Sequence, residues 1–167
     1  MTRPALPRPT LLPGLRRLWR DRHTLQLGLD PTRATVLELA DPALARLLDL
    51  LDGEHTERRV LAYAVRGGVP EADARTLLDT LRAAGLVVAA HTLLPPGLPE
   101  AVKRRLTAEA AALAASGAAA GTPAQALRRR AAARVVLTGG GRLAAPLAVT
   151  LADAGVGHIH ADLHGLV

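Results

Sequence analysis

Three consecutive glycines, Gly139–Gly141, constrain this chain more than any other feature, because they separate two segments of different periodicity. Before them, residues 134–138 (Arg-Val-Val-Leu-Thr) form a short apolar run, which favours a strand. After them, Leu147 and Leu151 stand four residues apart, as on one face of a helix over 143–154. Glycines end this helix, and a second strand follows at 158–163. We therefore predict a strand–helix–strand unit over 134–163.

The glycine turn has the residues of a nucleotide site. In such turns the first glycine permits the tight bend, the second lets a pyrophosphate approach the backbone, and a small third residue lets helix and strand pack closely. Gly139, Gly141 and Ala144 fill these places, with Arg142 in the same turn. The start of the helix offers free N–H groups and a partial positive charge to phosphate. Asp162 follows Gly139 by 23 residues, where a ribose-binding acid is expected. The alternative is a turn of the same fold that binds nothing.

The second strand carries a different set of candidate ligands. His158, His160 and Asp162 alternate with other residues, and His164 continues the pattern. Alternate residues of a strand share a face, and imidazoles with a carboxylate are ligands for zinc or nickel. We favour the interpretation without a metal, in which Asp162 is the ribose acid and the histidines lie at an exposed strand end.

The N-terminal half has the signals of a small domain over 23–90. Segments 24–29 and 34–39 alternate apolar residues around a turn, which predicts a hairpin. Three helices are expected next, beginning at Asp41, Thr56 and Pro70, each ended by a glycine. A short strand at 86–89 completes the order. This order predicts a winged-helix-like domain, so the fold class is α+β: this domain, then a truncated Rossmann-like unit from 134 to 167.

Two segments outside these domains carry most of the basic charge. Residues 1–22 hold six arginines, one aspartate and several prolines, and are predicted to form a basic arm. Residues 91–133 are rich in proline, alanine and arginine, and are predicted to form a connector. We interpret both as solvated, flexible segments. An arm that binds nucleic acid or an acidic partner is the alternative.

Composition excludes several classes of protein. The chain has no cysteine, which removes disulfide scaffolds, iron–sulfur sites and thiol catalysis and agrees with a cytoplasmic location. It has one Trp, one Tyr and no Phe, so it lacks the aromatic platforms on which single-stranded nucleic acid stacks. Its one serine, Ser116, has no activating neighbours. No apolar run is long enough to span a membrane, and prolines interrupt the segment where a signal peptide would lie.

Residues 135–157 resemble the opening of the ThiF/MoeB/HesA family of adenylating enzymes, which are related to ubiquitin-activating enzymes. The resemblance rests on the glycine turn, on Pro146 early in the helix, and on Ala-Gly-Val-Gly at 154–157. Asp162 matches the first acid of the Asp-x-Asp pair that usually follows, and His164 replaces the second. Arg142 stands where the family commonly has another glycine.

This resemblance implies ATP as the cofactor, held by Gly139, Gly141, Arg142, Ala144 and Asp162. The family's remaining ATP, magnesium and catalytic residues would lie beyond Val167. We therefore assign no catalytic residue, leave enzymatic activity open, and expect no adenylation by these 167 residues alone.

Residues 47–56, 68–72 and 81–86 resemble a second family, the PqqD-type peptide-recognition domains. These domains serve the maturation of ribosomally made peptide natural products. They bind a leader peptide as an added strand beside the sheet, against the third helix. The two resemblances together imply a ThiF-like protein of actinobacterial peptide modification, with a leader peptide or another modification enzyme as its partner.

Two other functions remain open. The chain would be a nucleotide-binding partner subunit if another chain completed its sheet, in a homo- or hetero-oligomer. A winged helix also serves DNA-binding regulators, but residues 70–84 hold two arginines against three acids, which disfavours nucleic acid.

Overall fold

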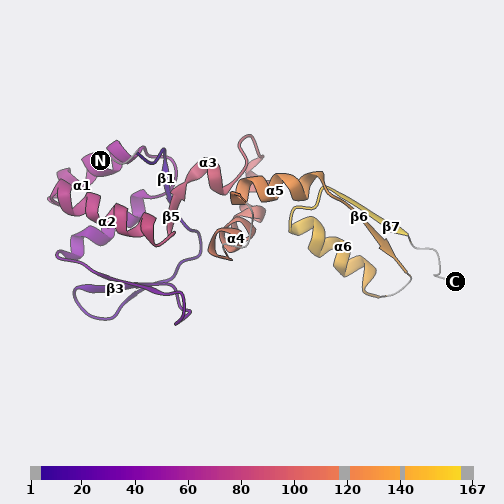
Figure 1. Ribbon diagram of the computed structural model, residues 1–167, viewed down its shortest axis with the longest axis horizontal. Coiled ribbons are helices and arrows are strands. Elements are labelled where there is room, and N and C mark those ends of the chain that lie inside the picture. The colour runs from indigo at the N-terminus through magenta and orange to yellow at the C-terminus, as the bar shows by residue number, and fades with distance from the viewer. Residues whose placement is uncertain (1–4, 117–120, 140–141, 163–167) are drawn as a thin grey trace. The chain divides into compact units, whose positions relative to one another are not determined.

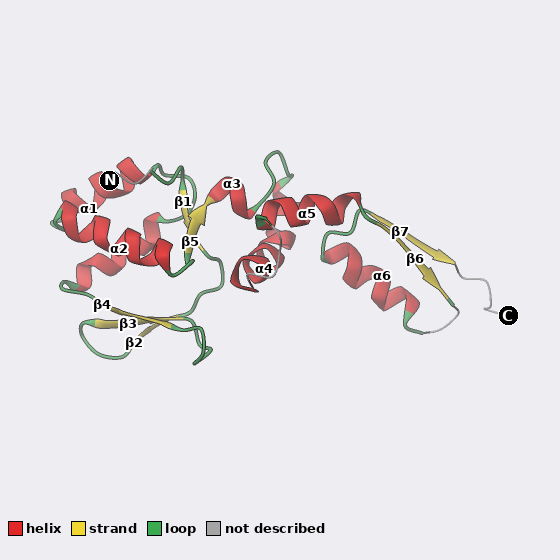
Figure 2. Ribbon diagram, in the orientation of Figure 1, coloured by secondary structure: helices red, strands yellow, loops and turns green. Residues whose placement is uncertain are grey.

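The computed structural model describes residues 5–116, 121–139 and 142–162, and it divides into two compact units, Met1–Ala90 and His91–Val167. Figure 1 follows the chain through both units, and Figure 2 marks the helices and strands. Helices alternate with small sheets, in agreement with the predicted α+β class. In the described part of the chain, no helix is long and apolar enough to cross a membrane.

Unit 1 contains β1 (Pro9–Leu11), β2 (Arg17–Trp19), β3 (Thr24–Leu27), β4 (Thr35–Glu38), the 3-10 helix η1 (Pro42–Leu50), α1 (Glu57–Arg66), α2 (Glu71–Ala83) and β5 (Val87–Ala89). The hairpin, the helix starts and the last strand agree with the sequence prediction. The first helix differs in kind, because it winds as a 3-10 helix throughout.

The main sheet of unit 1 has the order β2–β3–β4, with both pairs antiparallel. Successive side chains of a strand point to opposite faces, so the alternating leucines of β3 and β4 all enter the core. These are Leu25, Leu27 and Leu37, joined by Leu39. The turn between the strands is closed by Asp30, whose carboxylate accepts the Thr32 N–H at 2.9 Å.

Three helices cover the core, and polar side chains fix two of their starts. The Asp41 carboxylate accepts the Ala43 N–H at 2.8 Å, and the Thr56 hydroxyl accepts the Arg59 N–H at 3.4 Å. Such caps satisfy N–H groups that have no partner within the helix. The helices bury a set of aliphatic residues, namely Leu44, Leu47, Leu48, Val60, Leu61, Ala64, Ala74, Leu77, Leu78 and Leu81.

Residues 5–22, the described part of the predicted arm, do not form the flexible segment that the sequence predicts. Their strands β1 and β2 pair with β5 and β3. Leu12 is buried, and Leu6, Leu11 and Leu15 pack partly buried on the unit, which holds the segment in place despite its prolines. Proline is tolerated at the first residue of an edge strand, where Pro9 stands. The leucines of the segment thus anchor it to the core, whereas Leu18 and Trp19 are exposed.

Unit 2 contains α4 (Glu100–Ser116), α5 (Pro123–Ala132), β6 (Arg134–Thr138), α6 (Ala144–Asp153) and β7 (His158–Asp162), and α3 (Ala90–Leu93) lies where the units meet in the sequence. Within the predicted connector, α4 and α5 are therefore ordered helices. Thr122 caps α5 reciprocally with Gln125, a capping box. Leu106 and Ala110 of α4 are buried with Leu127 of α5.

The strand–helix–strand unit is present where the sequence predicts it. Strands β6 and β7 pair in parallel over five residues, from Arg134 opposite His158 to Thr138 opposite Asp162. Helix α6 connects them, as parallel strands require. Among the described residues of unit 2, β6 and β7 pair only with each other, and no residue of α6 is buried.

Candidate functional site

The turn between β6 and α6 contains part of the predicted nucleotide site. Gly139 follows the last residue of β6 and has φ +109°, a backbone conformation that L side chains rarely adopt. The N-cap of α6 is Leu143, whose side chain makes no capping hydrogen bond. No N-cap side chain therefore competes with an anion for the N–H groups of Ala144 and Ala145.

An open groove of about 440 Å³ lies at this turn. We call it the β6–α6 groove, and its lining residues are Val136, Leu137, Thr138, Gly139, Arg142, Leu143, Ala144 and Leu147. It combines an apolar wall with a cation, since Arg142 is the one charged residue among the described residues that line it. Apolar contact for a ring system and a guanidinium for phosphate are complementary to a nucleotide.

Three of the five predicted nucleotide residues, Gly139, Arg142 and Ala144, line this groove. Gly141 lies outside the described residues. Asp162 is the last residue of β7, and its backbone pairs with Thr138 beside the turn. The structure does not describe its side chain.

The alternating histidines of β7 do not form a described metal centre. His158 and His160 are exposed, and His164 lies outside the described residues. Within residues 5–116, 121–139 and 142–162, no group of three or more His, Cys, Asp or Glu side chains is placed to hold a metal ion.

The glycines after α6 have a packing role that the sequence analysis did not assign. A Cβ added at Gly157 would lie 1.8 Å from the carbonyl oxygen of Ala131, at the end of α5. Gly155 has φ +92°, and its added Cβ would lie 3.1 Å from Leu106 of α4. Arg130 of α5 reinforces this junction, since its guanidinium donates to Glu109 at 2.6 Å and to the Ala154 carbonyl at 3.2 Å. The Ala-Gly-Val-Gly segment at 154–157, just before β7, thus packs closely against α4 and α5.

Unit 1 has a second groove, of about 210 Å³, between β4 and α2. We call it the β4–α2 groove. Its walls are Val36, Leu37, Glu38, Leu39, Ala40 and Leu44 on one side and Asp73, Thr76, Leu77 and Thr80 on the other. The α2 residues are spaced i, i+3, i+4 and i+7, so they form a single face of the helix.

The β4 side of this groove is an open sheet edge. Leu39 N–H donates to the His23 carbonyl at 2.8 Å. In an antiparallel ladder every second residue bonds across to the partner strand, and the residues between turn their polar groups away. Val36 and Glu38 therefore direct their N–H and C=O groups to the free edge, where no described strand pairs with them.

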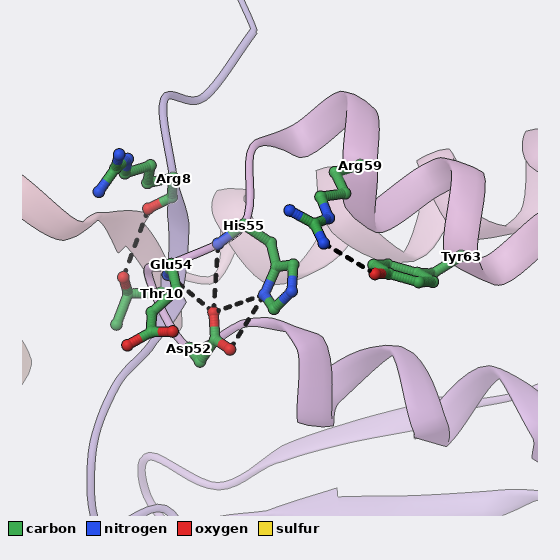
Figure 3. Close-up of polar contacts among 7 residues, drawn as sticks. All are labelled: Arg8, Thr10, Asp52, Glu54, His55, Arg59 and Tyr63. Carbon is green, nitrogen blue, oxygen red and sulfur yellow. Dashed lines mark hydrogen bonds and ion pairs between the residues drawn. The ribbon is translucent and has the colours of Figure 1, made fainter.

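A polar cluster that the sequence analysis missed lies before and along α1 (Figure 3). The Asp52 carboxylate accepts the N–H of Glu54 at 2.7 Å and the N–H of His55 at 3.3 Å, and it contacts His55 Nδ1 at 3.0 Å. Burial acts to raise the pKa of Asp52, but these N–H and imidazole contacts outweigh it and lower the pKa below its usual 3.8. Arg59 donates to the Tyr63 hydroxyl at 3.0 Å, which lowers the pKa of that phenol.

The loop at Asp52 and Gly53 positions β1. Gly53 N–H donates to the Pro9 carbonyl at 3.2 Å, and Asp52 forms a β-bridge with Thr10. The loop that Asp52 organises is therefore also the loop that β1 contacts. This loop therefore holds β1 against the rest of unit 1.

No protein-family model matches the sequence, and no curated protein matches it. Solved structures include chains of similar fold. MccB of E. coli, in a crystal structure with succinimide, is 16% identical over 92% of this chain, with a TM-score of 0.60. The heterocyclase TruD is 20% identical over 96% of this chain, with a TM-score of 0.57. A heterocyclase in complex with substrate and cofactor is 20% identical over 93% of this chain, with a TM-score of 0.55.

These similarities show a fold shared with one part of each larger protein. The chain spans 41% of the length of that MccB chain, 21% of TruD and 18% of the second heterocyclase. Other MccB structures contain ATP, or AMPCPP together with MccA. Because the matches cover 92–96% of this chain, they extend over both units.

Proposed function

We propose that this chain acts in the modification of ribosomally made peptides, with unit 1 as a PqqD-like winged-helix domain that binds a leader peptide. The observation that carries the proposal is the β4–α2 groove, which has both aliphatic and polar lining residues and lies beside an open strand edge. An extended peptide in this groove would continue the sheet through the outward N–H and C=O groups of Val36 and Glu38. Main-chain hydrogen bonds then supply affinity, and the groove walls supply selectivity.

The related structures support a peptide as the partner. MccB has been crystallised with MccA, and a heterocyclase with its substrate, and both share the fold of this chain. The position of the groove supports the same conclusion, because its lining residues come mainly from the edge strand β4 and the helix α2.

A proline substitution tests the strand-addition mode directly. The Val36 N–H points to the free edge, so Val36→Pro removes a donor for the peptide and no hydrogen bond to β3, and proline is tolerated on edge strands. The probe is a fluorescent dodecapeptide, selected from a random library displayed against the full chain. We expect Val36→Pro to weaken its binding at least about tenfold, since several main-chain bonds are affected.

The control is Val36→Thr, which keeps the N–H and the branched side-chain shape. It should leave the affinity of the peptide within about twofold. Equal binding by the wild type, Val36→Pro and Val36→Thr would reject strand addition at β4.

Unit 2 is proposed to be the ThiF-like, Rossmann-like part, with ATP held at the β6–α6 groove. The described residues fit this ligand, since Gly139 gives access to the backbone, α6 has an uncapped start and Arg142 supplies a cation. In the family that it resembles, ATP supplies an adenylyl group. In this chain, Arg142 would bind a phosphate and Ala144 would leave space beside the first turn of α6.

Calorimetric titration with ATP tests this part of the proposal. Arg142→Gln should weaken ATP binding about tenfold, because a charge-assisted contact to phosphate is lost. Arg134→Gln is the matched control, since Arg134 is an exposed arginine at the opposite end of β6. A loss of affinity in Arg134→Gln and none in Arg142→Gln would reject the β6–α6 groove as the site.

One observation favours a second function, a partner subunit completed by another chain. Strands β6 and β7 pair only with each other among the described residues, and Val136 is 61% exposed. Unpaired edges bind further strands. Light scattering of the purified chain distinguishes the two functions, because a partner subunit should form a defined dimer or bind a candidate modification enzyme.

A further inference from the structure

The exposed side of α1 is basic, and the function proposed above does not use it. The one acid of this helix, Glu57, is 7% exposed and accepts the Leu6 N–H at 2.6 Å, so its carboxylate is buried in unit 1. Arg58, Arg59 and Arg66 are exposed. In the described part of the chain, no carboxylate forms an ion pair with any of these three arginines.

Tyr63 holds two of these arginines in place. Arg59 donates to the Tyr63 hydroxyl oxygen at 3.0 Å, and Cζ of Arg66 lies 4.3 Å from the centre of the Tyr63 ring. His55 packs against the same ring edge to face, with 5.7 Å between the ring centres, and Figure 3 shows Arg59 and His55 beside Tyr63. Contact with an aromatic ring restricts a guanidinium before any ligand arrives. The two cations are therefore already positioned.

The Tyr63 hydroxyl can still donate a hydrogen bond. A guanidinium cannot accept one, so the phenol oxygen is the acceptor in the Arg59 contact and its own proton is directed elsewhere. Among the described residues, no acceptor receives this proton. Arg59, Arg66 and the hydroxyl thus supply a group of donors beside one half-buried ring. A carboxylate, which only accepts hydrogen bonds when ionised, is complementary to such a group.

A small apolar pocket adjoins Tyr63. It has a volume of about 110 Å³ and lies between η1 and α1. Its aliphatic walls include Leu47, Leu50 and Val69, and Tyr63 and Arg46 complete the lining. Arg46 is exposed and adds a third cation to the rim. An apolar side chain held in a pocket next to arginine and tyrosine is a common centre of protein–protein interfaces.

We infer that this surface binds an acidic segment of a partner protein. We call it the Tyr63 surface, and it consists of Arg46, Arg59, Tyr63 and Arg66. An aspartate or glutamate of the partner would contact Tyr63 and its two arginines, and an adjacent aliphatic side chain would enter the pocket. No residue lines both this pocket and the β4–α2 groove, so the Tyr63 surface would be a second binding site on unit 1.

The charges around the Tyr63 surface favour single carboxylates over a nucleic acid. Asp52 and Glu54 are exposed just before α1, and Asp52 contacts His55, which packs on Tyr63. A phosphate backbone carries a charge at every step and would meet these acids as well as the arginines. A protein segment can place its carboxylates only where the arginines lie.

Subtractive selection on the full chain identifies such segments. A displayed random dodecapeptide library is first depleted on immobilised Arg59→Gln/Arg66→Gln and then selected on the wild type. We expect the retained peptides to be enriched in aspartate or glutamate next to an aliphatic residue. They should bind the variant about five- to tenfold more weakly than the wild type, since two exposed charge-assisted contacts are lost. Higher salt should reduce this difference.

The matched control is Arg22→Gln/Arg33→Gln. It removes two exposed arginines of unit 1 that lie outside α1, and it should leave the affinity of the retained peptides within about twofold. The fluorescence of Trp19 and far-ultraviolet circular dichroism confirm that each variant is folded. Equal losses of affinity in the control and in Arg59→Gln/Arg66→Gln would overturn the inference, because general charge attraction would then explain the binding.

Tyr63→Phe tests the geometry of the site without changing its charge. The variant keeps the ring that Arg66 contacts but removes the hydroxyl that Arg59 contacts and that would donate to the partner. The affinity of the retained peptides should fall about threefold or more. An unchanged affinity would contradict a carboxylate site at Tyr63.

The outcomes also separate this inference from the proposed function. Val36→Pro should leave the retained peptides within about twofold of their wild-type affinity, because β4 is not part of the Tyr63 surface. Peptides that lose binding in Val36→Pro would lie at the β4 edge, which overturns this inference and leaves strand addition standing. A library without acidic enrichment would overturn it too. Binding of a fluorescent DNA duplex that is lost in Arg59→Gln/Arg66→Gln would assign the surface to nucleic acid instead.

Discussion

Helices α2 and α6 are both short and both lie beside strands, yet one side of α2 is buried and α6 is exposed along its length. Helix α2 carries five ionisable residues and still buries Ala74, Leu77, Leu78 and Leu81. Helix α6 has a single ionisable residue, Asp153, and buries none of its ten residues. The more apolar helix is therefore the more exposed one.

The difference shows that burial follows the distribution of apolar residues and the number of neighbouring elements, more than apolar content. In α2 the apolar residues share one face, and the sheet of unit 1 and the other helices supply surfaces for that face. In α6 apolar residues lie all round, and the described part of unit 2 offers it only a two-stranded sheet. A helix apolar all round is typical of the interior of a larger fold.

A matched pair of leucine truncations tests this contrast most strongly. Leu81→Ala in α2 removes a side chain that is 0% exposed, and it should cost about 2–5 kcal/mol in the free energy of unfolding. Leu147→Ala in α6 removes one that is 49% exposed, and it should cost less than about 1 kcal/mol. Urea unfolding is followed by Trp19 fluorescence for unit 1 and by amide hydrogen exchange for unit 2.

Equal losses of stability in Leu81→Ala and Leu147→Ala would contradict this contrast between α2 and α6. They would mean that α6 is covered in solution, for example by a second copy of the chain. In that case the cost of Leu147→Ala should grow with protein concentration, because association stabilises the folded state by mass action.

Local signals predict most of the elements of unit 1, and long-range pairing accounts for what they miss. Asp41 and Thr56 cap helices where the sequence places them, since a cap depends on residues two or three positions away. The strands β1 and β2 escape prediction because their partners, β5 and β3, set their conformation. The proline-rich composition of residues 1–22 suggests a solvated arm, although Leu12 is buried.

The two candidate sites differ in the same way, because one depends on local sequence and the other on long-range strand pairing. Glycine spacing within one segment predicts the β6–α6 turn, and Gly139, Arg142 and Ala144 line one groove there, while the use of that groove for a nucleotide stays a prediction. The β4–α2 groove follows from the strand order β2–β3–β4, which leaves β4 at the edge and which no local pattern encodes. Helix α5 had a readable signal that the sequence analysis overlooked, the Thr122 to Gln125 capping box with Pro123 between them.

A glycine substitution extends the comparison between α2 and α6. In unit 2 the close contacts lie just after α6, at Gly155 and Gly157, and not along the helix. Gly157→Ala would place a Cβ 1.8 Å from the Ala131 carbonyl, so the backbone must shift, and we expect a cost of about 1–3 kcal/mol. Hydrogen exchange of β7 measures the loss. The control is Gly67→Ala after α1, where the added Cβ would lie 3.3 Å from the Ala64 carbonyl and a small adjustment suffices. An undiminished protection of β7 in Gly157→Ala would contradict this packing role.

The Arg130 contacts provide a smaller test of the same junction. Arg130→Met keeps much of the side-chain volume but removes the bonds to Glu109 and the Ala154 carbonyl, and it should cost about 1 kcal/mol because the pair is about one-third exposed. Arg128→Met is the control, an exposed arginine on the same helix. Thermal unfolding at low and high salt is the measurement. A similar loss in both variants would assign the effect to net charge and not to the junction.

The smallest expected effect concerns the loop that holds β1 on unit 1. The pKa of Asp52 is lowered in the folded protein, so its contribution to stability is present above the usual value of 3.8 and is lost as the pH falls through the lower folded pKa. Asp52→Asn should cost about 1 kcal/mol or less at pH 7, because the N–H bonds of Glu54 and His55 lose their charged acceptor. The difference from the wild type should shrink below pH 4. Asp21 and Asp30 also have lowered pKa values, so only the difference between variants isolates Asp52.

Urea unfolding between pH 3 and 7, followed by Trp19 fluorescence, measures this difference in unit 1. Glu54→Gln is the control, since it removes the same charge two residues away without removing an acceptor of these N–H groups. Because Gly53 and Asp52 contact Pro9 and Thr10, hydrogen exchange in β1 should rise in Asp52→Asn and stay unchanged in β7. A pH-independent difference, or one shared by Glu54→Gln, would show that the N–H bonds of the loop do not hold β1 in place.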